Sequence, residues 1–340
     1  MHKMELSSEI AAGKSWRSTA PVFVVGCPRS GTTLLYHMLL SAGNFAMYRA
    51  ESQVFNVLEP RFGDLGKASH RQKLLQGWCG SALFSKTGLN VEEVKEKVMA
   101  ECRNGGDFLR LVMQAMAQQQ NVERWADSTP EHVLYLDRIK ATIPDALAIH
   151  MIRDGRDVAL SLQKQAWIRP FPWDRAKSLE VAALYWEWIV EEGRKRGKVL
   201  GSDYVEIHYE DLVQNPRQVL ARLSRFVEQD LDYERIQKIG VGAVSHPNSS
   251  FAAETEVGEF TPVERWRSSL DAAQLSVLEE LIGGTLQELS YPLESPGTRV
   301  AGRSLARMRS NYRWYFNMKL RLKRETALGR VFASRDLSWA

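Results

Sequence analysis

The stretch PVFVVGCPRSGTTLLYHMLL, residues 21–40, constrains the fold more than any other part of the sequence. The apolar run Val22–Gly26 is typical of a buried strand, and the pattern at Thr32–Ala42 is typical of a helix. The spacing Gly26-x-x-x-x-Gly31 between them is that of a phosphate-binding loop, whose backbone N–H groups hold an anion. The alternative is a loop whose glycines only permit a tight turn, and the polar donors that crowd this loop favour the anion site.

The loop lacks the lysine that reaches the β- and γ-phosphates in nucleotide triphosphatases. Thr32 occupies the position of that lysine, and Arg29 lies earlier in the loop. The hydroxyls of Ser30, Thr32 and Thr33 add hydrogen-bond donors, and Arg29 adds a permanent charge with a planar fork suited to oxyanions. This donor set disfavours ATP or GTP hydrolysis and predicts an anionic diester or anhydride as the ligand.

Short β-rich stretches alternate with long helical patterns along the chain. The predicted strands are Val22–Gly26, Arg124–Ala126, Leu147–Ile152 and Tyr204–His208. The predicted helices are Thr32–Ala42, Val91–Arg103, Asp107–Gln119, Glu131–Thr142, Arg156–Gln165, Ala176–Arg196, Pro216–Phe226 and Asp271–Leu289. The strand runs FVVG and LAIHMI are nearly all apolar, as expected when both sheet faces are covered. We therefore predict an α/β, P-loop-like three-layer fold with a central parallel sheet flanked by helices.

The composition is that of a globular protein, with 340 residues of which 44% are hydrophobic and 25% charged. Three cysteines without metal-ligand spacing, and no apolar signal segment in Met1–Ala20, predict a reducing, cytoplasmic location and no bound metal. The sequence contains no apolar run of about 18 residues, so we predict no membrane span. Since no Pro/Gly/Ser-rich hinge divides the chain, we expect an N-terminal extension at 1–20, one domain at 21–295 and a basic helical appendage at 296–340.

The net charge of +4 is unevenly distributed along the chain. Residues 301–340 contain ten Lys/Arg and two acids, which leaves the rest of the chain mildly acidic. This distribution argues against nucleic acid as a partner of the domain. The basic tail combines helix formers with aromatic residues and is compatible with three roles: packing on the domain, which we favour, formation of a homodimer, or peripheral contact with an anionic membrane.

A second strand–turn–helix unit lies at LAIHMIRDGRDVALSLQKQ, residues 147–165. Arg153 ends the strand, Asp157 is suited to cap the helix, and Ser161 follows about one turn inside it, facing the strand end. Because ligands of open α/β sheets bind beyond the carboxyl ends of the strands, Arg153 and Ser161 are predicted to hold one phosphate together. The alternative is a surface arginine beside a serine inside a helix.

The stretches GCPRSGTTLL and IRDGRDVALS resemble the 5′-phosphosulfate loop and the 3′-phosphate motif of the sulfotransferases that use 3′-phosphoadenosine-5′-phosphosulfate (PAPS). Two later stretches are similar to the same superfamily and in its order. They are VEIHYEDLVQNPRQVLARLSRFV, which in the family runs past the adenosine, and ERWRSSLDAAQLSVLEEL, the Trp-containing segment with the last helix. With the motifs PRSGTT and RDGRDVALS, the sequence resembles bacterial sulfotransferases related to the tyrosylprotein and carbohydrate branches. Animal cytosolic enzymes of the superfamily normally carry Lys in place of Arg29.

The resemblance implies transfer of a sulfuryl group from PAPS to a hydroxyl or amine of an acceptor, without a metal. Adenosine 3′,5′-bisphosphate (PAP) is then the product, and the acceptor is a saccharide, a lipid such as a glycolipid, a tyrosine or another small molecule such as a natural product. The resemblance assigns the 3′-phosphate to Arg153 and Ser161. It assigns the phosphosulfate to a group of loop residues, Arg29, Ser30, Gly31, Thr32 and Thr33.

A base must accept the proton of the acceptor. In the tyrosylprotein branch a glutamate shortly after the loop helix is the base, which implies Glu51 in MYRAESQVF. The alternative is His132, which lies 21 residues before Arg153, much as the base histidine of the cytosolic branch does. The surrounding WADSTPEHVLYL resembles the start of a helix more than that branch's motif, so Glu51 is the first candidate.

Other donor contacts rest on looser similarity. Tyr209 is expected near the adenine, Ser249 and Ser250 in HPNSSF match a late serine contact, and Arg267 is a second candidate for the 3′-phosphate. Ser128 departs from the family, because relatives commonly carry Lys there to steady the bridging oxygen. This departure leaves open how the leaving group is stabilised.

Two other function classes remain open at this point. A P-loop nucleotide kinase or NTPase is disfavoured by the missing lysine, and a non-catalytic adenosine-bisphosphate-binding protein would keep the loop without the chemistry. The aromatic loop Trp167–Trp173, which follows the second helix, is our candidate for a gate to the acceptor site.

Overall fold

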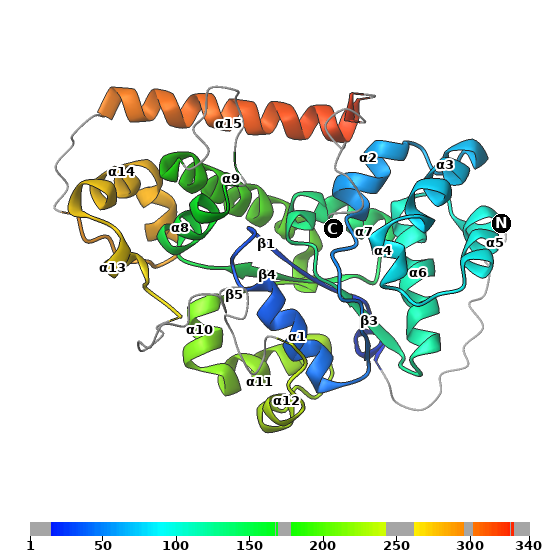
Figure 1. The fold of residues 1–340 in the computed structure, drawn as a ribbon. Helices are drawn as coiled ribbons and strands as arrows, with labels where there is room; N and C mark the ends of the chain where they lie inside the picture. Colours follow the sequence, from blue (N-terminus) through cyan, green and yellow to red (C-terminus); the bar gives the residue numbers. More distant parts are fainter. Residues whose placement is uncertain are drawn as a thin grey trace, which may run out of the picture.

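The structure, a computed structural model, describes residues 15–166, 168, 178–242, 262–295, 302–326 and 328–329. At its centre is a five-stranded sheet in the order β2-β3-β1-β4-β5, in which every pairing is parallel. The strands are β1 (Val22–Gly26), β2 (Phe45–Ala46), β3 (Arg124–Asp127), β4 (Leu147–Ile152) and β5 (Tyr204–His208). Helices cover both faces of the sheet (Figure 1). The predicted α/β fold with a central parallel sheet is therefore confirmed.

The strand β1 shows why the sheet is covered on both sides. Phe23 and Val25 belong to the hydrophobic core that includes α6, α8, α9 and α14, whereas Val22 and Val24 belong to a second core with α1, α10, α11 and α12. All four side chains are fully buried. Because successive side chains of a strand point to opposite faces, an all-apolar strand requires a core on each face.

The helices follow the predicted alternation with the strands. They are α1 (Thr32–Ala42), α2 (Glu59–Phe62), α3 (Ala68–Cys79), α4 (Ala82–Ser85), α5 (Val91–Glu101), α6 (Gly105–Gln119), α7 (Leu136–Thr142), α8 (Gly155–Gln165), α9 (Leu179–Gly197), α10 (Tyr209–Gln214), α11 (Pro216–Val227), α12 (Tyr233–Ile239), α13 (Trp266–Ser269), α14 (Ala272–Glu288) and α15 (Gly302–Glu325). A π-helix, η2 (Val54–Leu58), and 3₁₀ turns at η1 (Trp16–Ser18), η3 (Pro130–Tyr135) and η4 (Lys198–Asp203) complete the described elements. None of the described helices is long and apolar enough to cross a membrane.

Two predicted helices differ from the observed ones for identifiable reasons. Gly105 and Gly106, expected to separate two helices, begin α6 instead, with Asn104 as the side-chain N-cap. A Cβ on Gly106 would collide with Thr142 of α7, so the glycine allows close helix packing. The helix expected over Glu131–Thr142 is divided into the 3₁₀ turn η3 and the short helix α7.

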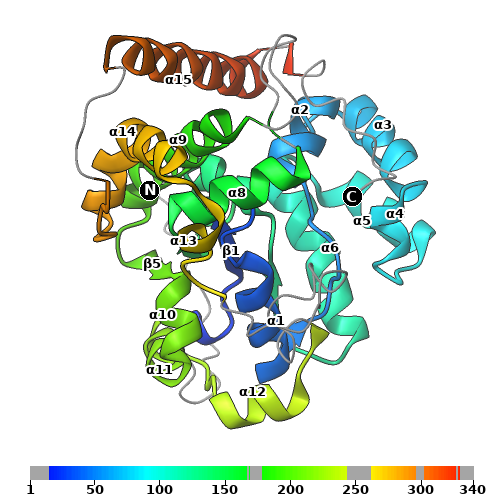
Figure 2. The ribbon, with the colours of Figure 1, turned by 60° about the vertical axis from the view of Figure 1, so that its left-hand side comes forward.

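The basic tail forms α15, which packs along α9 at the edge of the molecule (Figures 1 and 2). Tyr312, Phe316 and Leu320 repeat every four residues and are buried on one side of the helix. Arg309 donates two hydrogen bonds of 2.8 Å to the buried carboxylate of Glu187 in α9. One face of the tail therefore packs on the domain, which is the role that the sequence favoured.

Candidate active site at the carboxyl ends of β1 and β4

The loop between β1 and α1 has the backbone geometry of an open anion site. Gly31, the N-cap of α1, has φ +88°, and a Cβ there would collide with the ring of Tyr209. Glycine is thus required by both the left-handed backbone and the close approach. Arg29 also has a positive φ, of 77°, which is uncommon for a residue with a side chain and is typical of functional loops. Since no side chain caps α1, its first N–H groups are left to a ligand or solvent.

Ser30 is the clearest polar donor inside this loop. Ser30 is fully buried, and its Oγ has no hydrogen-bond partner among the described residues. A buried hydroxyl without a partner costs free energy, which a ligand oxygen would recover. Thr32, the first residue of α1, is also buried. The loop therefore holds hydroxyl donors in place before any ligand is present.

Arg153, at the end of β4, is held over the loop by several contacts. Its terminal nitrogens donate to the backbone oxygen of Arg29 (3.3 Å) and that of Pro262 (3.0 Å), and to the carboxylate of Asp157 (3.1 Å). Its guanidinium lies 4.4 Å from the centre of the Tyr209 ring. Tyr209 thus packs between Gly31 and Arg153, and it joins the two predicted phosphate sites.

Arg29 and Ser161 connect the loop directly to α8. The Nε of Arg29 donates to Ser161 Oγ at 3.0 Å, across 132 residues of sequence. Burial and the nearby charge of Arg153 lower the pKa of Arg29. Two guanidinium groups that approach each other in a partly buried place favour an anion between them. The structure thus brings together Arg29, Ser30, Arg153, Ser161 and Tyr209.

The turn after β4 departs from the expectation in its capping residue. Asp154, and not Asp157, is the N-cap of α8, and it accepts from the N–H of Arg156 at 2.9 Å. Asp157 lies within the first turn and accepts from Arg153 and from the N–H of Trp266 (2.9 Å). Burial raises the pKa of Asp157, while the charge of Arg153 opposes the rise. Asp157 therefore positions Arg153 and the segment that contains Trp266.

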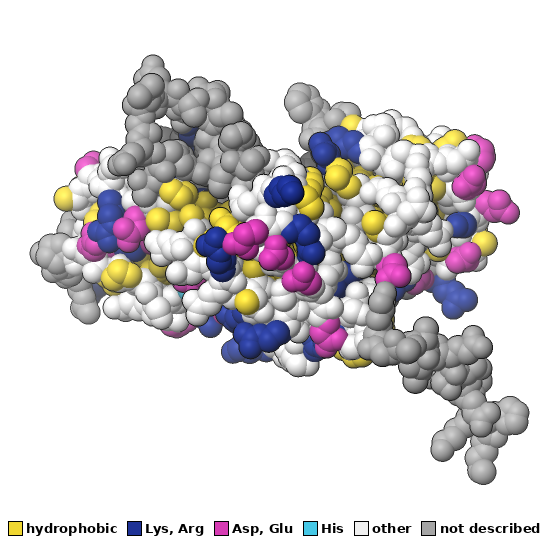
Figure 3. Space-filling model, turned by 90° about the horizontal axis from the view of Figure 1, so that it is seen from below, with side chains coloured by type: hydrophobic (Ala, Val, Ile, Leu, Met, Phe, Trp, Pro, Cys, Tyr) yellow, Lys and Arg dark blue, Asp and Glu magenta, His cyan; other side chains and the backbone are white. Residues whose placement is uncertain are grey.

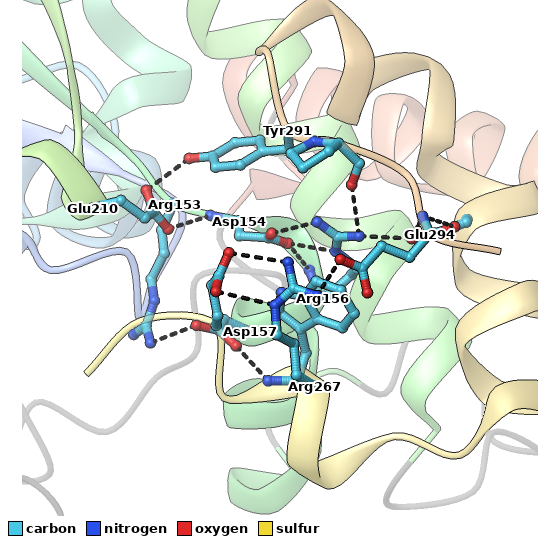
Figure 4. Close-up of polar contacts among 12 residues, drawn as sticks. Arg153, Asp154, Arg156, Asp157, Glu210, Arg267, Tyr291 and Glu294 are labelled. Carbon is cyan, nitrogen blue, oxygen red and sulfur yellow. Dashed lines mark hydrogen bonds and ion pairs between the residues drawn. The ribbon is translucent and has the colours of Figure 1, made fainter. Parts of the chain in front are cut away.

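Arg156 is the centre of a buried ion-pair cluster behind the site (Figure 4). It forms two hydrogen bonds with Asp154 (3.0 and 2.7 Å), one with Glu279 of α14 (2.6 Å) and one with the backbone oxygen of Pro292 (3.0 Å). Its guanidinium lies 3.8 Å from the centre of the Trp266 ring. These contacts attach α13, α14 and the chain after them to the turn that carries Arg153.

Glu210, the second residue of α10, connects the same turn to the end of the domain. Its carboxylate accepts from the N–H of Asp154 (3.0 Å) and from the hydroxyl of Tyr291 (2.8 Å). Figure 4 shows Glu210 between Asp154 and Tyr291. Burial raises the pKa of Glu210. Sequence reasoning did not identify Glu210 as part of the site, although it belongs to the motif HYEDL.

Glu51 faces a cavity of about 350 Å³ next to the loop helix. The lining comprises Thr33, Tyr36, His37, Tyr48, Arg49, Ala50, Glu51, Ser128, Val241 and Gly242. The cavity therefore joins the end of the phosphate loop to the predicted base and to Ser128. Glu51 accepts a hydrogen bond from the side chain of Gln53.

The floor of this cavity is aromatic. Tyr36 donates its hydroxyl proton to the backbone oxygen of Tyr48 (2.7 Å), and Tyr48 donates to that of Leu83 (3.1 Å), so both hydroxyls are engaged. Arg49 lies two residues before Glu51, and its Nε donates to the sulfur of Met47 (3.2 Å). Arg49 and Glu51 both line the cavity, and sequence reasoning did not identify Arg49 as part of it.

His132 has a different environment from Glu51. It is fully buried, its Nδ1 lies 2.8 Å from a carboxylate oxygen of Asp127, and its Nε2 accepts from the N–H of Phe55 at 3.2 Å. The Phe55 contact assigns the single ring proton to Nδ1, because Nε2 must present its lone pair. Both ring nitrogens are therefore engaged, Nδ1 with the end of β3 and Nε2 with η2.

Arg267 makes contacts other than the predicted one to a phosphate. It forms two hydrogen bonds with Glu264 (3.0 and 3.2 Å), an ion pair with Glu294, and a stacking contact with Trp266 at 4.6 Å. The predicted contacts Ser249 and Ser250 lie outside the described residues. The same holds for the aromatic loop Trp167–Trp173, except for Ile168.

The assembled groups define the chemistry that is available. Two arginines, buried hydroxyls and an uncapped helix N-terminus suit an anionic donor, and a carboxylate lines a cavity at the end of the loop. Among the described residues no group of three or more His, Cys, Asp and Glu side chains is arranged to hold a metal ion. The arrangement can bind an anion with two separate charged groups and accept a proton beside it.

Comparisons with known proteins agree with this geometry. The model of the sulfotransferase family matches residues 21–233. The nodulation protein NoeE of Sinorhizobium fredii is 22% identical over 307 residues, which cover 82% of this chain and 68% of that protein. The solved sulfotransferase domain of the olefin synthase from Synechococcus PCC 7002 is 20% identical, with a TM-score of 0.53 and coverage of 81% of this chain and 96% of that one. At this identity the structural likeness shows a shared fold alone.

Proposed function

The chain belongs to the sulfotransferase family, and on that premise we propose that it transfers a sulfuryl group from PAPS to an acceptor hydroxyl or amine. The observation that carries the proposal is the contact of Arg29 with Ser161, together with that of Arg153 with Arg29. Arg29 belongs to the loop and Arg153 to the end of β4, and two such cations support a donor with separate 5′-phosphosulfate and 3′-phosphate groups. If the donor had no 3′-phosphate, Arg153 and Ser161 would have no ligand group to bind.

Arg29, Ser30 and the N-terminal N–H groups of α1 are proposed to stabilise the charge that develops during transfer. In-line transfer breaks the bond between sulfur and the bridging oxygen of PAPS and forms a bond between sulfur and the acceptor atom. Negative charge then grows on the leaving phosphate, where preorganised donors contribute most. Arg153 and Ser161 retain the 3′-phosphate of PAP.

Glu51 is proposed as the base that receives the acceptor proton. It lines the cavity at the end of the loop, whereas His132 is buried with both nitrogens engaged. A base must lie within reach of the proton that it removes, and only Glu51 of these two lines that cavity. The acceptor, whether saccharide, lipid, tyrosine or another small molecule, would lie on the aromatic floor of Tyr36 and Tyr48.

The experiment compares Glu51→Gln with His132→Gln. Transfer is measured as PAPS-dependent gain of one sulfuryl group by compounds of a cell extract, detected by mass spectrometry. We expect Glu51→Gln to lower the rate about 10²–10⁴-fold without lowering thermal stability, because a general base is lost. We expect His132→Gln to lower stability and to keep the rate per folded molecule, because a buried pair is broken.

The opposite pattern would reject Glu51 as the base. PAP binding without transfer to any compound of the extract would instead favour a non-catalytic adenosine-bisphosphate-binding protein. Mg²⁺-dependent turnover of ATP would revive the kinase or NTPase alternative. Equal binding of PAP and AMP by the wild-type protein would remove the support for PAPS as the donor.

A further inference from the structure

Helix α15 has a second face, which the packing on α9 does not use. Arg303, Arg307, Trp314 and Arg321 are all exposed. Their spacing of i, i+4, i+11 and i+18 places them within about 40° of one another on a helix of 3.6 residues per turn. The buried residues Tyr312, Phe316 and Leu320 lie on the opposite side. We call the four exposed residues the outer stripe.

The charge of α15 is strongly one-sided. The helix contains eight Lys/Arg and a single acid, Glu325. Arg309, Arg313 and Arg324 form ion pairs with acids of the domain, namely Glu187, Glu191 and Asp137.

The arginines of the outer stripe have no such partners among the domain residues that the structure describes. Arg303 and Arg307 make no ion pair with a described residue. Among the described residues Arg321 pairs with Glu325 alone, and both side chains are more than half exposed, so solvent screens this pair. The outer stripe therefore keeps most of its positive charge.

Trp314 is the apolar part of the outer stripe. Its side chain is 63% exposed, although tryptophan is a residue type that proteins usually cover. Tryptophan is enriched at the interface between lipid and water, where an apolar ring and an N–H donor are both accommodated. An exposed tryptophan among basic residues combines apolar contact with charge, the two attractions that hold a helix on an anionic membrane surface.

The placement of α15 suits a planar partner. The helix forms a ridge along one edge of the molecule in both ribbon views (Figures 1 and 2). The outer stripe extends over 18 residue steps, from Arg303 to Arg321, or about 27 Å at 1.5 Å per residue. The opposite face of the molecule, seen in Figure 3, has basic and acidic side chains interspersed. The outer stripe itself contains no acidic residue, so it presents a surface of one charge sign along the ridge.

We propose that the outer stripe of α15 docks the protein on an anionic lipid surface. A second copy of the chain is a poorer partner, because a two-fold interface would bring the same arginines face to face. Nucleic acid is also a poorer partner, because the rest of the chain carries a net negative charge that would repel it. A membrane touches the ridge alone and supplies both the negative charge and the interfacial region that Trp314 requires.

The test is co-sedimentation of the full chain with vesicles of phosphatidylcholine alone and with vesicles that contain phosphatidylglycerol. We expect binding to the anionic vesicles only, and a loss of binding as salt shortens the range of the charges. The double variant Arg303→Glu/Arg307→Glu should bind at least about ten-fold more weakly, since each basic residue near the surface contributes. Trp314→Ala should weaken binding less and should leave its salt dependence unchanged.

The matched control is Arg217→Glu/Arg222→Glu, which makes the same charge change on exposed positions of α11. Figure 1 places α11 on the other side of the sheet from α15, so this variant should bind vesicles as the wild type does. Equal binding to neutral and anionic vesicles, or equal losses in both double variants, would overturn the proposal. So would wild-type dimerisation that Trp314→Ala abolishes, or binding of a DNA duplex in the absence of vesicle binding.

Discussion

The site is built from two strand–turn–helix units that differ in how they use polar groups. In the first unit, β1 and α1, the loop keeps donors uncommitted: Ser30 Oγ has no described partner, and α1 has no side-chain cap. In the second unit, β4 and α8, the turn is filled with ion pairs, in which Arg156 contacts both Asp154 and Glu279. Similar motifs therefore serve different purposes, an open anion site and a rigid attachment.

The difference separates groups that act on a ligand from groups that hold the fold. Arg153 belongs to both kinds, because Asp157 and the backbone of Pro262 hold it while it lies over Tyr209. Arg156 is three residues away and is entirely enclosed. Substitutions in the first unit should thus change binding and rate, and those at Arg156 should change stability.

The largest effect is expected from Arg156→Met. Removing the guanidinium leaves Asp154 and Glu279 as buried charges without their partner, which typically costs about 3–5 kcal/mol. Urea unfolding measures the change in the free energy of unfolding. The control is Arg267→Met, which removes the exposed ion pairs with Glu264 and Glu294. It should lower the free energy of unfolding by less than about 1 kcal/mol. Equal losses in the two variants would remove the distinction between attachment and surface charge.

Arg29→Ala is expected to have the next largest effect, on the rate rather than on stability. Loss of a preorganised donor to developing charge typically lowers a rate about 10²–10³-fold. The rate of PAPS-dependent transfer is the measurement, and the melting temperature is the control. Arg29→Lys should recover part of the rate, since it restores the charge without the planar fork. A large fall in melting temperature with little change in rate would place Arg29 among the structural residues.

The smallest effect is expected from Ser30→Ala. Because the hydroxyl is buried without a described partner, its removal should leave stability unchanged or slightly higher. The affinity for PAP should fall by about five-fold, the equivalent of about one hydrogen bond. Isothermal titration calorimetry measures the affinity. If Ser30→Ala destabilised the protein and left PAP affinity intact, the loop would be committed to the fold, as the second unit is.

The sequence predicted the elements that carry a strong local signal. The strands β1, β4 and β5 have the predicted bounds. In β1 and β4 a nearly all-apolar run between turn residues leaves little choice, and in β5 the β-rich run YVEIH gives the signal. The strand β2 has two residues, too few for any periodicity, and was not predicted. The local sequence predicts a break at Gly105 and Gly106, because their place in α6 depends on close contacts with residues far away in the chain.

For the site, the sequence predicted which motifs meet but not how each side chain is used. Arg29, Arg153, Ser161 and Tyr209 come together because parallel strands end at one edge. The sequence predicts Asp157 as the N-cap of α8, whereas Asp154 has that role in the structure. Both are acids at the start of the helix, and the backbone conformation that decides between them cannot be read from the sequence. The contact of Arg267 with Glu294 could not be found from the sequence, because Glu294 lies 27 residues away in the chain.

The central claim is that the two units together recognise a nucleotide with separate 5′- and 3′-charged groups. Calorimetric titration of the wild type and Arg153→Ala with PAP and with AMP tests it most directly. The account predicts that the wild type binds PAP at least about ten-fold more tightly than AMP, since charge-assisted contacts to the extra phosphate are strong. It also predicts that Arg153→Ala binds both alike. Equal affinities in the wild type, or a preference for PAP that survives in Arg153→Ala, would contradict it.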